Sequence, residues 1–525
     1  MRPVVLSGFM GTGKTTIGPR LAARLGVPFA DTDDVIVRAA GKSVPELWHE
    51  VGEASFRARE GEALERLLGD GTPKVIALGG GAVTVDRTRR YAIDRALVVT
   101  LTASPETVVA RTPDIASRPN LAVGADPVAR ARELLAARAP AYAECHLTLS
   151  SETLDVDAIV DAIAALVERD PLLVPLGTRS YTLDLCDGDP SRLTDAIARC
   201  APSSVLLVDD SNVQRFRGAS IEAALQPLAL EARRVTLPPG ESQKTLATVA
   251  TIWDAALGAG VDRDVLVVAV GGGVVGDLAG FAAACLLRGV RFLQVPTTLL
   301  AMVDASVGGK TGFDHPAGKN LVGAFHQPRA VVADLVHLET LPAREIAAGL
   351  AEVVKIALTS DADLFDRVER DAARLARGDR AALRPVVRAA IEAKIRVVRD
   401  DERESGLRAL LNLGHTVGHA VEAHGGFSRW LHGEAVALGL VAELRAAAHL
   451  GWTPPALADR VADLLSSLGL PFHVDRAEVL ASWPYVAADK KRSGLHVRLP
   501  VVETAGVSRL ERVRLEVLRQ AVLGG

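Results

Sequence analysis

Short apolar runs alternate with amphipathic stretches over the first third of the chain, a pattern that predicts an α/β domain around a buried parallel sheet. The predicted strands and the helix that closes the domain are Val4–Leu6, Val75–Leu78, Ala96–Leu101 and Asp155–Val167. Residues 169–172 are charged and include a proline, so we place a linker there. The first predicted domain therefore spans residues 1–168.

A second α/β pattern begins near residue 173. Its continuous apolar runs are bounded by turn residues and predict parallel strands at Val205–Val208, Val265–Val270 and Phe292–Val295. After residue 337 the pattern becomes helical, with predicted helices at Arg344–Leu358, Arg384–Val398, Gly414–Ala423, His432–Leu450 and Leu457–Leu468. We therefore predict an α/β domain over 173–337 and a mainly helical domain over 338–525.

Composition changes this picture little. The 525 residues are too many for a single core, and a net charge of −4 argues against a surface built for nucleic acid or membrane. The N-terminus lacks the pattern of a secretory signal, and apolar runs stay below the roughly 18 residues that span a bilayer. The four scattered cysteines suggest reduced thiols, so we expect a cytoplasmic protein that acts on small molecules.

Residues 8–15 read GFMGTGKT and fit the phosphate-loop pattern GxxxxGK[ST] between a predicted strand and a helix. In such a loop, backbone N–H groups surround phosphate oxygens, the lysine reaches the β- and γ-phosphates, and the hydroxyl after it binds Mg²⁺. The pattern predicts ATP and Mg²⁺ but leaves the acceptor open. The predicted ATP contacts are Gly11, Thr12, Gly13, Lys14, Thr15 and Thr16, of which Thr15 would also bind Mg²⁺.

Further motifs at matching spacings resemble shikimate kinase over the whole first domain. They are Asp31-Thr32-Asp33, Gly52-Glu53 with Phe56-Arg57 and Glu60, Gly79-Gly80-Gly81-Ala82, Arg118-Pro119, and Arg138-Ala139-Pro140 with Tyr142. The resemblance implies a P-loop kinase fold and phosphorylation of shikimate to shikimate 3-phosphate. Arginine forks suit the carboxylate of that acceptor.

The resemblance also implies individual roles in the kinase. Arg57 and Arg138 would hold the carboxylate, and Gly80 would lie against the ring. Asp33 would orient the hydroxyls and accept the attacking proton. Asp31 would help to hold Mg²⁺ through water, and Arg118 would lie on a lid near the nucleotide.

Residues 271–277 read GGGVVGD after a predicted strand, which by itself is a weak sign of a dinucleotide site. With DLAGFAA at 277–283, PGExxK at 239–244 and PTTLLA at 296–301, the chain from about Val174 onward resembles 3-dehydroquinate synthase. The resemblance implies a variant Rossmann-like fold that binds NAD⁺. Its implied NAD⁺ contacts are Asp209, Glu241, Lys244, Gly273, Val274, Val275, Gly276, Asp277, Thr297, Thr298, Lys310 and Lys319.

Three helical segments supply candidate metal ligands. Glu352 lies on one, His415 and His419 lie one helical turn apart on the next, and His432 begins a third. A Glu/His/His set with an open position suits catalytic zinc or a similar divalent metal, but spacing alone leaves open which two histidines bind it. The resemblance assigns Glu352, His415 and His432 to the metal and places His419 near the substrate phosphate.

Two more segments are typical of the synthase, DASVGGKTG at 304–312 with KNL at 319–321, and DExExGxR at 401–408. The resemblance implies that the substrate pocket is lined by Asp304, Lys310, Asn320, Lys355, Lys394, Glu404, Arg408, Asn412 and Lys490. Whether Lys490 or Lys491 faces the substrate stays open. The resemblance further implies a homodimer through the synthase part, with Arg288 reaching into the partner's pocket.

The distribution of lysine supports an anionic substrate independently. Only ten of the 60 basic residues are lysines, and seven of these lie in the motifs above: Lys14, Lys244, Lys310, Lys319, Lys355, Lys394 and Lys490. Because the chain otherwise prefers arginine, a retained lysine is a candidate for a role that a guanidinium cannot fill.

The resemblance implies that the second part converts 3-deoxy-arabino-heptulosonate 7-phosphate to 3-dehydroquinate, with transient oxidation at C5, release of phosphate and no net redox change. One alternative is another small-molecule kinase fused to a metal-dependent polyol dehydrogenase, which would accumulate NADH. Another is a scaffold with regulatory nucleotide sites. The lysines argue against the dehydrogenase, and the retained Lys14, Asp33 and Glu352 argue against the scaffold.

Overall fold

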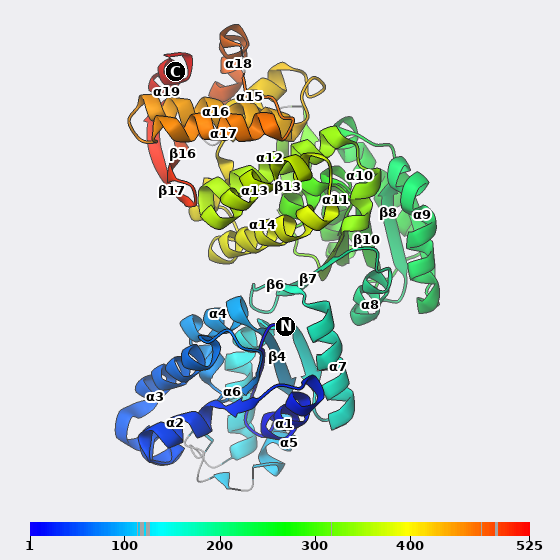
Figure 1. The fold of residues 1–525 in the computed structure, drawn as a ribbon. Helices are drawn as coiled ribbons and strands as arrows, with labels where there is room; N and C mark the ends of the chain where they lie inside the picture. The colour runs from blue at the N-terminus through cyan, green and yellow to red at the C-terminus, as the bar shows by residue number, and fades with distance from the viewer. Residues whose placement is uncertain are drawn as a thin grey trace. The chain divides into compact units, whose positions relative to one another are not determined.

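The computed structural model describes residues 1–112, 114–115, 120–121, 126–316, 318–473, 475–488 and 492–524. The chain divides into two compact units, Met1–Asp184 (unit 1) and Leu185–Gly525 (unit 2) (Figure 1). The predicted linker at 169–172 coincides with the end of one helix and the beginning of a strand. The predicted division into domains 1–168, 173–337 and 338–525 stays a prediction.

Unit 1 is built on a five-stranded parallel sheet in the order β2-β3-β1-β4-β5. The strands are β1 (Val4–Gly8), β2 (Phe29–Asp31), β3 (Val75–Ala77), β4 (Leu97–Thr102) and β5 (Leu147–Ser150). All of β1 is buried, because helices cover both faces of the sheet, and it therefore appears in the sequence as an unbroken apolar run. The three predicted strands coincide with β1, β3 and β4.

Two layers of helices enclose this sheet. On one face, α1 and α7 pack Leu21 and Ile163 against Leu6, and on the other, α3 and α4 pack Leu64 and Ile93 into a second core. The helices of unit 1 are α1 (Lys14–Leu25), α2 (Thr32–Ala40), α3 (Val44–Leu68), α4 (Asp86–Arg95), α5 (Pro105–Ala110), α6 (Pro127–Ala143) and α7 (Val156–Arg169). The predicted closing helix coincides with α7.

A second sheet has the order β6-β7-β14-β11-β10-β8-β9, and its strands from β14 to β9 run parallel. The strands are β6 (Leu172–Val174), β7 (Tyr181–Cys186), β8 (Val205–Asp210), β9 (Ala232–Leu237), β10 (Leu266–Gly271), β11 (Arg291–Pro296) and β14 (Ala330–Asp334). The order of the strands reverses between β8 and β10. In open α/β sheets, such a reversal opens a crevice at the carboxyl ends of the strands, where ligands bind.

Helices cover both faces of the parallel part of this sheet. On one face lie α8 (Ser191–Cys200) and α9 (Ser211–Leu225), and on the other α10 (Leu246–Gly258) and α11 (Gly273–Cys285). Every residue of the central strand β10 is buried. The prediction of a variant Rossmann-like α/β domain is confirmed.

The rest of unit 2 is mainly helical, also as predicted (Figure 1). Its helices are α12 (Ala343–Ser360), α13 (Ala362–Ala376), α14 (Arg380–Asp400), α15 (His415–His424), α16 (His432–His449), α17 (Pro455–Ser467), α18 (Arg476–Ala488) and α19 (Leu515–Gly524). A hairpin of β12 (Lys310–His315) and β13 (Gly318–Phe325) precedes them. Five of these helices coincide with predicted ones, and α13, α18 and α19 have no counterpart among the predictions.

A three-stranded antiparallel sheet near the C-terminus was not predicted. It comprises β15 (Arg492–Ser493), β16 (His496–Thr504) and β17 (Val507–Arg514). Pro500 interrupts the apolar pattern of β16, and a proline in a candidate strand argues against the strand. Among the described residues, β15 pairs only with the first two residues of β16, so Pro500 lies beyond that pairing and has its ladder partner in β17.

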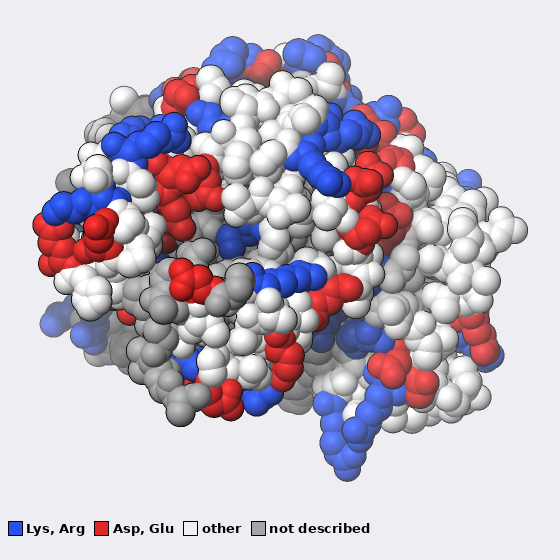
Figure 2. All heavy atoms as spheres, turned by 90° about the horizontal axis from the view of Figure 1, so that it is seen from below, with Lys and Arg blue, Asp and Glu red and all other residues white. Residues whose placement is uncertain are grey.

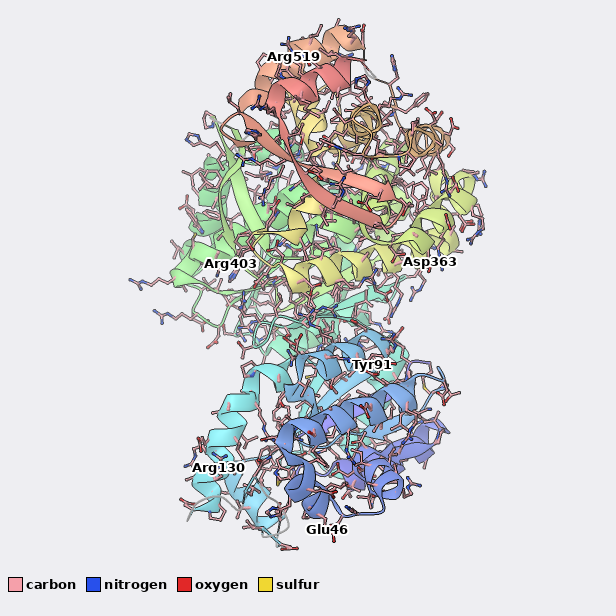
Figure 3. All side chains as sticks on the ribbon, turned by 90° about the vertical axis from the view of Figure 1, so that its left-hand side faces the viewer. Glu46, Tyr91, Arg130, Asp363, Arg403 and Arg519 are labelled. Atoms are coloured by element: carbon pink, nitrogen blue, oxygen red, sulfur yellow. The ribbon has the colours of Figure 1, made fainter. Side chains whose placement is uncertain are left out.

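The surface mixes both signs of charge. On the face in Figure 2, Lys and Arg side chains are interspersed with Asp and Glu. In Figure 3, Asp363 in α13 and Arg403 just after α14 are charged residues at the exposed surface of unit 2. Within the described ranges, none of the helices is both long and apolar enough to cross a bilayer.

Candidate active sites

The phosphate loop joins β1 to α1. Gly13 caps α1 with a left-handed φ of 92°, which a glycine adopts at little cost. The ammonium of Lys14 donates hydrogen bonds of 2.8 Å to the carbonyl oxygens of Gly8 and Phe9, so it is held against the loop. The hydroxyl of Thr12 donates a hydrogen bond of 2.7 Å to the same Phe9 oxygen. The loop is thus preformed at a helix N-terminus, where anions bind favourably.

A cavity beside the phosphate loop contains all four residues predicted to bind the acceptor. Asp33, Arg57, Gly80 and Arg138 line it together, although they come from four separate motifs. The other lining residues, which have no predicted role, include Met10, Trp48, Glu60 and Asn120. The cavity therefore combines two guanidinium groups, a carboxylate and an aromatic wall.

Close packing around this cavity explains the run of glycines at 79–81. A Cβ on Gly81 would lie 2.1 Å from Cζ of Arg57, so only glycine leaves room for that guanidinium. Arg57 also lies 5.0 Å from the ring centre of Trp48 and pairs with Glu60 at 2.7 Å. Arg138 donates a hydrogen bond of 3.2 Å to the carbonyl oxygen of Gly80. Both arginines are therefore held in place before a ligand arrives.

Two carboxyl groups near this cavity have raised pKa values. Burial raises the pKa of Glu60 to about 7, although its ion pair with Arg57 opposes the shift. Burial and the charge of Asp33 raise the pKa of Asp31 to about 6. Asp31 caps α2 by accepting a hydrogen bond of 3.0 Å from the N–H of Asp33. Groups that titrate close to neutral pH are typical of active sites.

In unit 2, the glycine loop follows β10 and opens α11 at the reversal of strand order. The N-cap of α11 is Gly272, and a small cavity at the loop is lined by Gly271, Gly273, Gly276 and Asp277. A helix N-terminus at the carboxyl end of a parallel strand suits a pyrophosphate. The predicted residues Val274 and Val275 lie in the first turn of the same helix.

Four other predicted NAD⁺ residues lie around this loop. Asp209, at the end of β8, is fully buried and accepts a hydrogen bond of 2.8 Å from Thr236. Lys244 pairs with Asp277 at 2.6 Å and donates a hydrogen bond of 2.7 Å to the Asn320 side chain. The N–H of Thr297 donates to the carbonyl oxygen of Gly271, and the hydroxyl of Thr298 accepts a hydrogen bond from the N–H of Ala301.

The candidate metal ligands converge on one carboxylate. Oε1 of Glu352 lies 3.5 Å from Nε2 of His432 and 3.8 Å from Nε2 of His415. Ligand atoms about 2.0–2.1 Å from a tetrahedral metal lie roughly 3.4 Å from one another, so these three atoms fit a single ion. His419 also lies in the group, with ligand atoms of the three histidines within 4.8 Å of one another. The structure thus brings all four candidate ligands together, and the assignment of the metal to Glu352, His415 and His432 stays a prediction.

The second ring nitrogen of each of these two histidines faces an oxygen atom. Nδ1 of His415 lies 3.1 Å from the carbonyl oxygen of Leu413, and Nδ1 of His432 lies 3.5 Å from Oε2 of Glu422. Such partners hold Nε2 toward a metal. Burial opposes ionisation of Glu352, but the charge of Lys355 and a hydrogen bond from His432 keep its pKa below the usual range. Glu352 is therefore a carboxylate, the form that binds metal.

Three ion pairs line the predicted substrate pocket, each joining a lysine to a carboxylate. They are Lys355 with Glu352, Lys394 with Asp304, and Lys310 with Glu404. Asn412 donates a hydrogen bond of 2.7 Å to the same Glu404. Arg408 is buried and donates a hydrogen bond to the carbonyl oxygen of Glu402. The structure thus brings together predicted residues from segments far apart in sequence, and Lys355 contacts the candidate metal ligand Glu352.

Comparison with known proteins identifies both parts of the chain. Residues 10–168 match the family model for shikimate kinase. Residues 234–348 and 349–492 match the N-terminal and C-terminal models for 3-dehydroquinate synthase. The chain belongs to both families. The predictions of the fusion, its fold class and its two enzyme activities, a shikimate kinase and a phosphate-eliminating 3-dehydroquinate synthase, are confirmed.

Parts of the chain are also similar to solved structures. The chain is 31% identical to ValA, a 2-epi-5-epi-valiolone synthase from Streptomyces hygroscopicus subsp. jinggangensis 5008 with NAD⁺ and Zn²⁺ bound (TM-score 0.59; 66% of this chain, 96% of that one). It is 26% identical to a 2-deoxy-scyllo-inosose synthase in complex with carbaglucose-6-phosphate, NAD⁺ and Co²⁺ (TM-score 0.62; 68% and 99%). It is 34% identical to a shikimate kinase from Acinetobacter baumannii in complex with shikimate (TM-score 0.31; 32% and 94%).

Some residues predicted for the kinase and the synthase stand apart from these groups. Arg118, Lys490 and Lys491 lie outside the described residues. Arg288 is exposed in the turn after α11, with a left-handed φ of 70°. By contrast, the ammonium of Lys319 lies 3.0 Å from the carboxylate of Glu241, another predicted NAD⁺ contact, and 3.0 Å from that of Glu422.

Glu422 has no predicted role, although the sequence contains a signal for one. Glu422 follows His415 by seven residues and His419 by three, which places all three on one face of α15. Its carboxylate faces His432, a candidate metal ligand.

The kcat/KM of the synthase is expected to fall about tenfold per pH unit above pH 8. Burial lowers the pKa of Lys394 to about 8, assisted by Lys355 and Arg408 and opposed by Asp304. As pH rises through this value, the ammonium loses its proton and its attraction for an anionic substrate. The measurement is the pH profile of phosphate release from pH 6.5 to 9.5. Lys394→Arg should remove the falling limb, and a flat wild-type profile would contradict the role of Lys394.

Proposed function

We propose that unit 1 transfers the γ-phosphoryl group of ATP to a hydroxyl of shikimate in the cavity beside the phosphate loop. The observation that carries this proposal is that Asp33, Arg57, Gly80 and Arg138 line one cavity there. Arg57 and Arg138 would hold the carboxylate, and Gly80 would lie against the ring. Bound Mg²⁺, held by Thr15 and through water by Asp31, would neutralise charge on the phosphates.

The kinase residues would act mainly by positioning. Asp33 would orient the attacking hydroxyl and accept its proton. Lys14, with backbone N–H groups of residues 11–16, would hold the phosphates in line with that hydroxyl. Arg118 is proposed to lie on a lid over the nucleotide.

In unit 2, we propose that Glu352, His415 and His432 bind one Zn²⁺ or a similar divalent metal, and that NAD⁺ binds at the loop 271–277. The observation that carries the metal proposal is the convergence of two Nε2 atoms on Oε1 of Glu352 at 3.5 and 3.8 Å. When bound, the metal would polarise the substrate oxygen at C5, and NAD⁺ would accept and return the hydride.

The residues of this chain would hold 3-deoxy-arabino-heptulosonate 7-phosphate while its C5 changes oxidation state. His419 and the lysines at 310, 355, 394 and 490 would bind the phosphate and the carboxylate. Asp304, Glu404, Asn320, Arg408 and Asn412 would orient the lysines and the hydroxyl groups. A clamp on both anionic ends keeps one carbon in place through successive steps.

Assembly and location are also proposals. We propose a homodimer through the synthase part, in which the exposed Arg288 reaches the pocket of the other subunit, in the cytoplasm. The left-handed backbone at Leu287 and Arg288 supports this proposal, because a strained exposed turn is often maintained by function. We also keep the division into domains 1–168, 173–337 and 338–525.

The synthase proposal is tested by supplying the heptulosonate phosphate with a small amount of NAD⁺. We expect many equivalents of phosphate per NAD⁺, no steady growth of NADH absorbance, and 3-dehydroquinate as the product by mass spectrometry. Shikimate with ATP should give ADP in a separate assay. NADH that grows in step with turnover would favour a polyol dehydrogenase. A carbocyclic product other than 3-dehydroquinate would favour an activity like that of the valiolone or inosose synthase instead.

A further inference from the structure

One buried carboxylate lies between the candidate metal site and the candidate cofactor site. Glu422 is 4% exposed and lies on α15, the helix that also carries His415 and His419. Its Oε2 faces Nδ1 of His432 at 3.5 Å, and its Oε1 pairs with Nζ of Lys319 at 3.0 Å. Each oxygen therefore has a different partner, and the two partners belong to different parts of the site.

On the metal side, the partner is the ring nitrogen that does not face Glu352. Nε2 of His432 lies 3.5 Å from Oε1 of Glu352, so the ring is held between two carboxylates. A carboxylate at Nδ1 keeps the proton there and leaves the Nε2 lone pair for a metal. His415 obtains the same orientation from the carbonyl oxygen of Leu413.

On the cofactor side, Lys319 continues the contact away from the metal. Its ammonium lies 3.0 Å from Oε1 of Glu241, in the PGExxK segment expected to surround NAD⁺. It also lies 4.3 Å from the ring centre of Phe427, in the turn that follows α15. A chain of charged groups thus runs from Glu241 through Lys319 and Glu422 to His432.

We propose that Glu422 is a positioning residue of the synthase, whose single carboxylate orients His432 for the metal and Lys319 for the cofactor. The inference rests on the metal and cofactor sites proposed above. Burial supports it: a carboxylate removed from water is costly unless its charge is compensated, and here the compensating groups are Lys319 and the His432 ring. Movement of either group would leave one oxygen of the buried Glu422 carboxylate without its partner, so the three groups hold one another in place.

The test measures binding rather than turnover. The dissociation constant for Zn²⁺ is obtained on the full chain by competition with a chromophoric chelator, and that for NAD⁺ by calorimetry on the Zn²⁺-loaded protein. We expect Glu422→Gln to weaken Zn²⁺ about 10- to 100-fold, the usual effect of losing the partner of a ligating histidine. Lys319→Met should leave Zn²⁺ binding near the wild-type value, because it does not touch His432.

NAD⁺ binding supplies a second, independent readout. Glu422→Gln and Lys319→Met should each weaken NAD⁺, and the double variant should be no weaker than the worse single variant, since both changes remove the same ion pair. Additive losses would overturn the proposed link through Lys319. Wild-type Zn²⁺ affinity in Glu422→Gln would overturn the role toward His432.

Two control variants test whether Glu422 positions the metal ligand or only stabilises the fold. Glu434→Gln removes another buried carboxylate from the first turn of α16, where it pairs with Arg344 instead of a histidine, and it should keep wild-type Zn²⁺ affinity. Glu422→Asp keeps the charge but withdraws it by one methylene group, and it decides the matter if Glu422→Gln does not fold. Wild-type Zn²⁺ affinity in Glu422→Asp would then overturn the proposal. Failure of the wild-type chain to bind Zn²⁺ would refute the metal site itself.

Discussion

Lys14→Met is expected to lower kinase turnover roughly 10²- to 10³-fold, the usual effect of removing one preorganised group that stabilises developing charge. The Lys14 ammonium is fixed at 2.8 Å from two loop carbonyl oxygens, at the point where the β- and γ-phosphates would bind. A methionine fills similar space without the charge. The measurement is ADP formation with shikimate and ATP.

The second activity of the same chain provides the control for this variant. Phosphate release by the synthase should stay at the wild-type rate in Lys14→Met, because the lysine lies in the other unit. Lys42→Met removes an exposed lysine of unit 1 that pairs with Glu50, and it should leave kinase turnover unchanged. Undiminished kinase turnover in Lys14→Met would contradict the assignment of residues 8–15.

Glu352→Gln is expected to abolish metal binding at micromolar Zn²⁺ and to lower synthase turnover more than about 100-fold, beyond the usual effect of an outer-shell change. The amide keeps the shape of the side chain but loses the charge on which His415 and His432 converge. It also leaves Lys355 buried without its carboxylate partner. Metal content by elemental analysis and phosphate release are the two readouts.

Variants of the three histidines test which of them bind the metal. His415→Ala and His432→Ala should lose metal, whereas His419→Ala should keep metal and lose activity. Glu345→Gln, at the beginning of the same helix α12, should retain both. Equal loss of metal from all three histidine variants would contradict the separation of roles among them. Kinase activity should persist in every one of these variants.

The sequence predicts the parallel sheets well because strands buried on both faces leave continuous apolar runs. It predicts the two glycine loops equally well, because a tight turn and a close helix N-terminus restrict the residue types that fit. The hairpin β16–β17 escapes prediction although its strands are neighbours in the chain, because Pro500 breaks the apolar pattern of β16 and charged residues dominate β17.

In the candidate sites too, the sequence predicts some residues and not others. Residue types at motif spacings identify Lys14, Glu352 and His415, whose chemistry is specific. They assign no role to Glu60 or Glu422, because a glutamate on a helix usually faces solvent, and only the fold reveals that these two are buried against charged partners. The lysines were predicted, but their internal carboxylate partners depend on contacts between segments far apart in sequence.

The three ion pairs of the synthase pocket make ligand binding resemble ion exchange. Lys310, Lys355 and Lys394 already have the carboxylates of Glu404, Glu352 and Asp304 as built-in counterions. An incoming anion must compete with these carboxylates rather than meet bare positive charge. Free phosphate can engage only part of the set, whereas a substrate with a phosphate at one end and a carboxylate at the other can engage several lysines at once. We therefore expect the pocket to exclude the small inorganic anions of the cell and to depend only weakly on ionic strength.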